Sequence, residues 1–288
     1  MKIALSGYRG LIGSSLEEEL IGKGHSVVRL SREVLYDFRG DTLSGVLKGT
    51  DAVVHLSGAP IIKRWTEKNR KEIYDSRIIT TRNLVQALRK IEKADRPNIF
   101  ISASAIGIYE SGSRHTEAST KLAGNFAAQI IKDWEQASAN LPEGVRRVIF
   151  RIGLVLDRRA ILIRQLRLPF LLFAGGPIGN GKQPFPFVHL QDVTGAIRWA
   201  LESGSTSGIY NLVAPEEVTN GAFSKAFGKQ LRRPSWFPVP RLPLKLMFGK
   251  AAQLVYESPA VVPERLLTEG YPFRYPTLAE ALGEIEGA

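Results

Sequence analysis

Short apolar runs alternate with longer segments whose apolar residues recur at helical spacing over roughly the first half of the chain. The apolar runs predict strands at residues 2–6, 26–30, 34–38, 51–56, 98–103 and 145–152. The helical spacing predicts helices at residues 14–23, from Asp41 to just before Gly49, between Thr66 and Ile91, and at about 122–139. Strands that alternate with helices indicate a parallel sheet with helices on its faces.

The regular alternation ends after residue 152. Residues 158–181 form a basic, apolar segment followed by the glycine-rich Gly175–Gly181, which we interpret as a loop over a pocket. A helix is expected after Asp192 and a late strand at 209–213, whereas beyond residue 215 prolines separate short helices that cannot extend a sheet. The fold class is therefore α/β, a Rossmann-type doubly wound parallel sheet with a small, mainly helical C-terminal lobe. We expect the Rossmann domain to span 1–155 plus about 185–215, and the substrate lobe to span 156–184 and 216–288.

Composition narrows the functional classes. The chain has no cysteine, which excludes disulfides, thiolate nucleophiles and cysteine-ligated zinc. No apolar run reaches the roughly 18 residues of a membrane span, and the first strand runs directly into a glycine turn rather than a signal peptide, so a cytoplasmic protein is expected. The net charge of +11 favours an anionic partner, but the basic residues are scattered. A solvated basic surface is therefore favoured over a nucleic-acid site.

The glycine turn after the first strand is the strongest motif. It reads Gly7-Tyr8-Arg9-Gly10-Leu11-Ile12-Gly13 and stands between a predicted strand and a predicted helix. Glycines allow a tight turn and close backbone approach, and the helix N-terminus offers free N–H groups to phosphate. The turn predicts binding of the pyrophosphate of a nicotinamide cofactor.

The end of the second predicted strand bears on the choice between NADP(H) and NAD(H). An NAD site typically has an acid there, whereas this chain has Ser31-Arg32. Arg32, together with Arg9 of the glycine turn, suits a 2′-phosphate, so NADP(H) is preferred, although Glu33 leaves NAD(H) open. Asp37 and Phe38 are candidates to contact adenine, with a plain turn role for Asp37 as the alternative.

Several further motifs occur in a fixed order along the chain. They are the glycine turn, His55–Pro60, Arg64-Trp65-Thr66, Ser76-Arg77, Ser102–Gly107, Arg151-Ile152-Gly153, Gly175–Gly179, His189–Asp192 and Asn211–Pro215. As a set they resemble the atypical and extended short-chain dehydrogenase/reductases. More narrowly, they are similar to the epimerase-like proteins of the NAD-dependent epimerase/dehydratase group that carry a C-terminal domain of unknown function, some of them labelled cell-division inhibitors.

The resemblance implies roles for individual residues. Gly7, Gly10 and Gly13 would hold the pyrophosphate, while Leu56, Ser57 and Gly58 would pass beside the nicotinamide ribose. Arg77 of the Ser76-Arg77 motif joins the cofactor-binding set. Ser104, at the end of the fifth predicted strand, would occupy the place of the superfamily's catalytic serine.

One family feature is missing. The superfamily uses a tyrosine as general acid/base with a lysine four residues later, but none of the eight tyrosines here has a lysine at that spacing. Whether Phe126 or Ala127 aligns with the tyrosine, the lysine position holds an isoleucine. The resemblance implies that this loss is shared by the subgroup. Tyr109 and Glu117 are candidate substitutes. The alternative for Tyr109 is a purely packing role, and the alternative for Glu117 is a solvated acid in a loop.

Two other segments have competing interpretations. Asp192 is expected to cap the helix that follows it rather than to act with His189, and the four histidines give little support to a metal site. The segment Arg158–Phe173 mixes four arginines with aliphatic residues. It is interpreted as a lid over an anionic substrate, as a core helix with solvated arginines, or as a membrane-surface or partner-binding segment.

The leading functional hypothesis is an NADP(H)-binding oxidoreductase or epimerase-like protein acting on an anionic or nucleotide-like small molecule. The alternative is a non-catalytic cofactor-binding sensor or regulator, one with a role in cell division. Nucleic-acid binding is the weakest hypothesis, integral membrane association is not expected, and a homodimer is left open.

Overall fold

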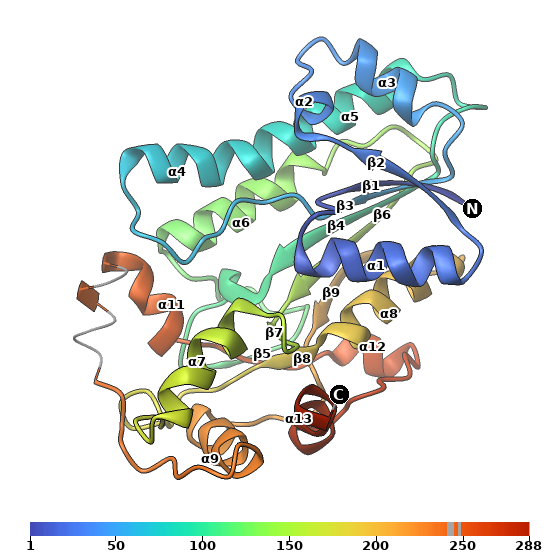
Figure 1. Cartoon of the computed structure of the whole chain (residues 1–288). Helices are drawn as coiled ribbons and strands as arrows, with labels where there is room; N and C mark the ends of the chain where they lie inside the picture. The colour runs from blue at the N-terminus through green and yellow to red at the C-terminus, as the bar shows by residue number, and fades with distance from the viewer. Residues whose placement is uncertain (241–244, 247–248, 288) are drawn as a thin grey trace.

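A computed structural model describes residues 1–240, 245–246 and 249–287. A six-stranded parallel sheet crosses its centre in the order β2-β1-β3-β4-β6-β9 (Figure 1). The strands are β1 (Lys2–Ser6), β2 (Ser26–Leu30), β3 (Ala52–His55), β4 (Ile99–Ala105), β6 (Arg146–Ile152) and β9 (Gly208–Leu212). The parallel Rossmann-type sheet is confirmed, and these six strands match predicted strands with small shifts at their ends.

Helices cover both faces of the sheet (Figure 1). Side chains alternate along each strand, so Ile3 and Leu5 of β1 share a core cluster with Leu16 of α1, whereas Ala4 joins Leu84 of α5. One face carries α1 (Leu11–Gly22) and α8 (Leu190–Glu202), and the other carries α3 (Asp41–Leu47), α4 (Glu67–Tyr74), α5 (Thr80–Lys90) and α6 (Phe126–Ala137).

The predicted strand at 34–38 is wrong. Ser31 instead begins a short helix, α2 (Arg32–Leu35), because its Oγ accepts the N–H of Val34. The chain then turns at Asp37, whose carboxylate accepts backbone N–H groups at the start of α3. The alternation of Val34, Tyr36 and Phe38 imitates a strand, but the Phe38 ring is exposed to solvent. Consequently β2 is the edge of the sheet.

The long helical stretch predicted between Thr66 and Ile91 is confirmed, with an added feature. Between α4 and α5 the helix widens into a π-helical turn, Asp75–Ile79. Such turns carry one extra residue and shift side chains relative to a regular helix, and they are frequent at functional sites. This one aims Ser76 and Arg77 at the loop after β3.

The remaining elements form a lobe below the sheet (Figure 1). It contains a second apolar cluster in which Phe170, Phe223 and Phe227 pack with Leu282. Its helices are α7 (Ile161–Leu171), α9 (Asn220–Gln230), α11 (Gln253–Tyr256), α12 (Glu264–Thr268) and α13 (Leu278–Gly287). It also contains two short pairs of parallel strands. In one pair β7 (Leu154–Leu156) lies beside β8 (Phe187–His189), and in the other β5 (Arg114–His115) lies beside β10 (Ala260–Val261).

The glycine-rich segment 175–181 packs closely against the chain at 237–239. Val239 N–H donates to the Pro177 carbonyl at 2.8 Å, and Gly179 N–H donates to the Val239 carbonyl at 3.0 Å. A Cβ at Gly176 would lie 2.1 Å from the Phe237 carbonyl oxygen, so the glycine permits this close packing. The segment thus forms a backbone clasp within the lobe, and its position over a pocket stays a prediction.

Within the described residues, none of the helices has the length and apolar character needed to cross a membrane.

Candidate functional site

The glycine turn forms a cradle that only glycine can build. Gly7 has a left-handed backbone (φ 74°), and its carbonyl accepts the Gly10 N–H at 2.9 Å. A Cβ at Gly13 would lie 2.2 Å from the Gly7 carbonyl oxygen, and one at Gly7 would lie 2.7 Å from the Leu56 carbonyl carbon. The turn thus brings the N-terminus of α1 close to the ends of β1 and β3, which suits the residues to a dinucleotide pyrophosphate.

A cavity of about 340 Å³ opens beside this cradle. Its walls come from the glycine turn, the end of β2, α2, the loop after β3 and the π-helical turn. Eight predicted residues line it, namely Gly7, Tyr8, Arg9, Gly10, Arg32, Leu56, Ser57 and Gly58. Eight more were not predicted: Leu30, Leu35, Tyr36, Ala59, Pro60, Glu72, Ser76 and Thr80. Most of these are sequence neighbours of predicted residues, whereas Glu72 and Thr80 come from the helices around the π-helical turn.

Two exposed arginines stand at the mouth of the cavity. Arg9 lies over the ring of Tyr8 and Arg32 over the ring of Tyr36, each 5.5 Å from the ring centroid. Among the described residues, no carboxylate forms an ion pair with either arginine. The carboxylate of Glu33 instead interacts with Ser31, whose hydrogen bond lowers the pKa of Glu33. Both guanidinium groups therefore remain available to an anionic ligand.

The other predicted cofactor residues lie around the cavity rather than in its wall. Asp37 takes the turn role, because its carboxylate accepts the N–H groups of Arg39 and Thr42 at 3.1 and 2.8 Å. Phe38 packs edge-on against Tyr36 and is 70% exposed. Leu11, Ile12 and Gly13 form the first turn of α1, and Ser31 caps α2.

The loop after β3 is held from behind by the π-helical turn. Ser76 Oγ accepts the Ala59 N–H at 2.9 Å, and Arg77 Nη1 donates to the Ala59 carbonyl at 2.9 Å. A Cβ at Gly58 would lie 2.9 Å from the Arg77 guanidinium carbon. Burial lowers the pKa of Arg77 to about 10, so the group is still a cation at neutral pH. Arg77 therefore positions the loop and does not itself line the cavity.

A buried histidine fixes the start of the same loop. His55 Nδ1 lies 2.7 Å from Ser6 Oγ, and its Nε2 lies 3.2 Å from Thr80 Oγ1. Burial, together with the nearby charge of Arg77, lowers the pKa of His55 to about 3. The imidazole is thus neutral, and it ties β1 and β3 to α5 beneath the cofactor cavity.

The helix in which the resemblance places the tyrosine and lysine pair is α6, and it contains no tyrosine. Asn125 caps α6 by accepting the Ala128 N–H at 2.9 Å. Phe126 packs edge-on against Trp65 with ring centroids 5.0 Å apart, and the Arg70 guanidinium lies 4.7 Å from its ring centroid. Ile130 and Ile131 are buried. These positions present apolar groups that cannot transfer a proton.

Ser104 enters a buried polar network at the ends of β4 and β6. Its Oγ donates to Glu135 Oε1 of α6 at 2.6 Å. Arg151 of β6 binds the same carboxylate through Nε at 2.8 Å and Nη2 at 2.7 Å. Burial alone would lower the pKa of Arg151, but the hydrogen bond and charge of Glu135 raise it above its usual value. This ion pair was not predicted.

The network includes both substitute candidates. Arg151 Nη1 donates to the Tyr109 hydroxyl at 2.7 Å, and that hydroxyl lies 2.8 Å from Asn211 Oδ1, its acceptor. The Asn211 N–H donates to Glu117 Oε1 at 2.8 Å, whereas Glu117 Oε2 is buried without a partner. Burial raises the pKa of Tyr109 and that of Glu117. The structure thus brings Ser104, Tyr109 and Glu117 together, in the interior rather than in the wall of the cofactor cavity.

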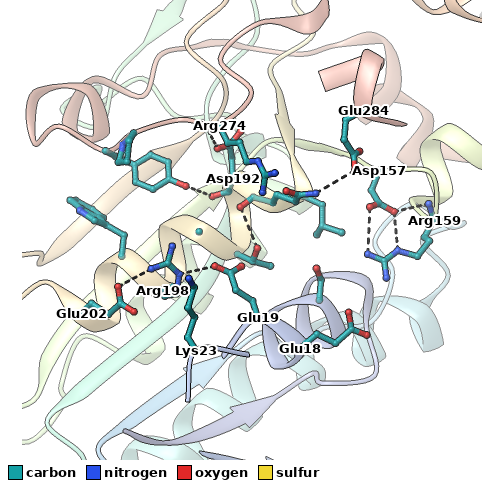
Figure 2. Close-up of a pocket in the computed structure, with 18 of the residues that line it drawn as sticks. Glu18, Glu19, Lys23, Asp157, Arg159, Asp192, Arg198, Glu202, Arg274 and Glu284 are labelled. Carbon is teal, nitrogen blue, oxygen red and sulfur yellow. Dashed lines mark hydrogen bonds and ion pairs between the residues drawn. The ribbon is translucent and has the colours of Figure 1, made fainter. Parts of the chain in front are cut away.

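A larger cavity of about 810 Å³ lies elsewhere, between α1, α8 and the C-terminal segment (Figure 2). Its charged groups largely pair with one another. Arg198 binds Glu19 and Glu202 at 2.7 and 2.9 Å, and Arg159 binds Asp157 at 3.1 Å. None of the predicted cofactor or catalytic residues lines this cavity. It lies where the helices α1 and α8 meet the C-terminal lobe.

Asp192 lines that cavity and does not cap α8 as expected. His189 is the capping residue, because its Nδ1 accepts the Gln191 N–H at 3.3 Å. The Asp192 carboxylate accepts the N–H groups of Arg274 and Tyr275 at 2.6 and 3.0 Å, which anchors the C-terminal segment on α8. Across the described part of the chain, no three His, Asp or Glu side chains are grouped to hold a metal ion.

Comparisons with known proteins agree with this geometry. The family model described as NAD dependent epimerase/dehydratase family matches residues 3–212, and a domain of unknown function, DUF1731, matches residues 239–285. The epimerase family protein SDR39U1 of Mus musculus is 35% identical over 297 residues, covering 99% of each chain. The epimerase family protein YfhF of Bacillus subtilis is 31% identical over 299 residues, covering 99% of this chain and 98% of its own.

Solved structures show the same fold. Human SDR39U1 (isoform 2), crystallised with NADPH, has a TM-score of 0.91 and 32% identity, and the match covers 100% of this chain and 99% of that one. The UDP-glucuronic acid 4-epimerase of Bacillus cereus, in complex with UDP-glucuronic acid and NAD, has a TM-score of 0.77 at 18% identity, with 100% and 98% coverage, and so shares the fold alone. The glycine cradle and the parallel sheet agree with these matches. The chain therefore belongs to the NAD-dependent epimerase/dehydratase family of short-chain dehydrogenase/reductase proteins, with a DUF1731 domain at residues 239–285.

Proposed function

We propose that the protein is an NADP(H)-dependent oxidoreductase or epimerase-like enzyme that acts on an anionic or nucleotide-like small molecule. The observation that carries the proposal is that Arg9 and Arg32 line the cavity without an ion-pair partner among the described residues. In addition, β2 is followed by Ser31 and Arg32 rather than by an acidic residue. Two such guanidinium groups suit a 2′-phosphate, because each can make planar bidentate hydrogen bonds to phosphate oxygens. The NADPH in the human relative's structure supports the same choice.

The residues around the cavity have defined roles in this proposal. The glycine cradle and the α1 N-terminus bind the pyrophosphate, Arg9 and Arg32 bind the 2′-phosphate, and the loop held by Arg77 lies beside the nicotinamide ribose. The bound cofactor would supply hydride transfer. The lack of cysteine suits a reducing compartment, and we place the protein in the cytoplasm.

Tyr109 is our proposed proton-transfer residue. Burial has the larger effect and raises the pKa of Tyr109, while a cation, Arg151, donates to its hydroxyl and acts to lower that pKa. Ser104 is proposed as a positioning residue, since its hydroxyl is engaged by Glu135. Glu117 is proposed as the second candidate for proton transfer, because its Oε1 accepts the N–H of Asn211, the residue whose side chain binds the Tyr109 hydroxyl.

A specific observation favours a second candidate function. Ser104 and Tyr109 are both buried and hydrogen-bonded within the protein. If these two hydroxyl groups stay bonded within the protein, it can bind the cofactor without catalysing a reaction. The second candidate is therefore a cofactor-binding sensor or regulator. The relatives named above are called epimerase family proteins, and those names do not refer to cell division.

Two measurements separate these functions. Calorimetry of the wild-type protein with NADPH and with NADH comes first, and failure to bind either in the high micromolar range would exclude both functions. A screen of carbonyl compounds for NADPH oxidation comes second. Turnover that falls at least about a hundredfold in Tyr109→Phe would support the enzyme and the role of Tyr109. An unchanged rate would remove Tyr109 from the mechanism, and NADPH binding without turnover would favour the sensor.

A further inference from the structure

The basic residues are scattered along the chain, but two segments contain no acidic residue and therefore account for the net positive charge. Residues 158–191 contain five Lys and Arg, and residues 218–256 contain seven, while neither segment contains Asp or Glu. The whole chain has a net charge of +11, so all other residues together have a net charge of −1. The charge is therefore a property of these two segments and not of the whole surface.

The two segments meet in the lower lobe (Figure 1). Arg233 Nε donates to the Leu171 carbonyl at the end of α7 at 3.4 Å, and its guanidinium lies 4.9 Å from the ring centroid of Phe173. The Phe237 backbone packs against Gly176. The C-terminal end of α7 and the chain at 231–240 thus lie side by side at the lower left of Figure 1.

Large apolar side chains are exposed at this meeting point. We call this surface the apolar tip, and its residues are Leu168, Leu171, Leu172, Phe173, Trp236 and Phe237. Their exposed fractions run from 37% for Leu171 to 80% for Trp236. Single exposed apolar residues are ordinary on protein surfaces, whereas a group supplied by two adjoining segments, with Arg232 and Arg233 close to Trp236 in the chain, is typical of an interaction site.

The backbone at the apolar tip is unusual for its residue types. Phe173 and Arg232 both have left-handed backbones, with φ of 60° and 55°, which side chains with a Cβ adopt rarely. Phe173 is 55% exposed, so burial in the core does not offset the cost of this conformation. A strained residue that displays its ring to solvent is a feature typical of binding surfaces.

We propose that the apolar tip binds the surface of an anionic lipid bilayer, with Leu172, Phe173 and Trp236 entering the headgroup region. Basic residues around an apolar patch suit such a surface, because lipid phosphates attract the guanidinium groups while apolar side chains leave water. Aliphatic side chains make up half of the tip, and they neither stack on bases nor hydrogen-bond to them. Lipid is therefore favoured over nucleic acid.

Vesicle co-sedimentation of the full chain tests this proposal. The protein should bind vesicles that contain phosphatidylglycerol, bind vesicles of phosphatidylcholine alone much more weakly, and be released from the anionic vesicles in part by salt. The double variant Phe173→Gly/Trp236→Ser should lower the partition coefficient at least about tenfold. Glycine suits the left-handed backbone at 173, so this variant should fold, and an unchanged circular dichroism spectrum would verify it.

The matched control is Ile21→Ser, which removes an apolar side chain that is 56% exposed on α1, far from the tip in sequence and element. It should bind vesicles like the wild type.

Absence of binding to anionic vesicles at low salt, or equal binding by the double variant, would overturn the proposal. Tighter binding to a single-stranded oligonucleotide than to vesicles, lost in the double variant, would assign the tip to nucleic acid instead. A wild-type dimer that becomes monomeric in the double variant, without vesicle binding, would assign it to a second copy of the chain.

Discussion

The Arg151 guanidinium clasps the Glu135 carboxylate through two hydrogen bonds of 2.7 and 2.8 Å, and both side chains are at most 10% exposed. The pair links β6 to α6 beside Ser104, near the end of β4. Since the same guanidinium donates to Tyr109 and the same carboxylate accepts from Ser104, this pair positions both of these hydroxyl groups.

Breaking this pair should be costly. Glu135→Gln leaves the Arg151 charge buried without a counter-charge, so we expect the free energy of unfolding to fall by about 3–5 kcal/mol. Urea denaturation measures the loss. The matched control is Glu217→Gln, which breaks an exposed 2.9 Å pair with Arg114 and should cost less than about 1 kcal/mol. Equal losses for the two variants would refute the structural role of the buried pair.

The glycine cradle should tolerate no side chain at Gly13. In Gly13→Ala the new Cβ would meet the Gly7 carbonyl oxygen, so we expect lower stability, by about 1–3 kcal/mol, together with loss of NADPH binding. Gly22→Ala is the control in the same helix, because a Cβ there has no neighbour within 4 Å. That variant should gain about 0.5–1 kcal/mol and keep NADPH affinity. Undiminished NADPH binding by Gly13→Ala would argue against the cradle.

The buried His55 should make stability depend on pH. Its pKa is lowered to about 3 in the folded protein from the usual value of 6.5, so the unfolded chain takes up a proton below pH 6.5 that the folded chain does not. Its contribution to stability is therefore complete above pH 6.5 and is lost as the pH falls towards 3. Between pH 7 and 5 the wild type should lose about 2 kcal/mol more than His55→Gln. Parallel pH profiles for the two proteins would contradict a neutral, buried imidazole.

The glycine turn and most strands could be predicted because their signals are local. Glycine spacing between a strand and a helix, and apolar runs bounded by turn residues, depend only on neighbouring residues. The strand at 34–38 could not be predicted correctly, because the alternation of Val34 and Tyr36 competed with the helix-capping signal of Ser31. That hydroxyl and the turn made by Asp37 decided the structure.

The buried network needed contacts between residues far apart in the chain. Tyr109 and Asn211 are separated by 102 positions, and no sequence spacing joins them. One signal was available, since Arg151 stands in an otherwise apolar strand end, and a charge there requires a buried partner. Its partner Glu135 looked like an ordinary helix residue. Likewise, the anchoring role of Asp192 depends on Arg274 and Tyr275, which only the folded chain brings near.

The preference for NADP(H) is the central claim, and the ratio of the NADPH and NADH dissociation constants tests it most directly. Calorimetry would compare the wild type, the double variant Arg9→Ala/Arg32→Ala and the control Arg39→Ala, an exposed arginine outside the cavity. We predict that the wild type and the control bind NADPH more tightly than NADH. The double variant should lose about a hundredfold in NADPH affinity while keeping its NADH affinity. Equal binding of both coenzymes by the wild type, or an unchanged ratio in the double variant, would contradict the assignment of these arginines to the 2′-phosphate.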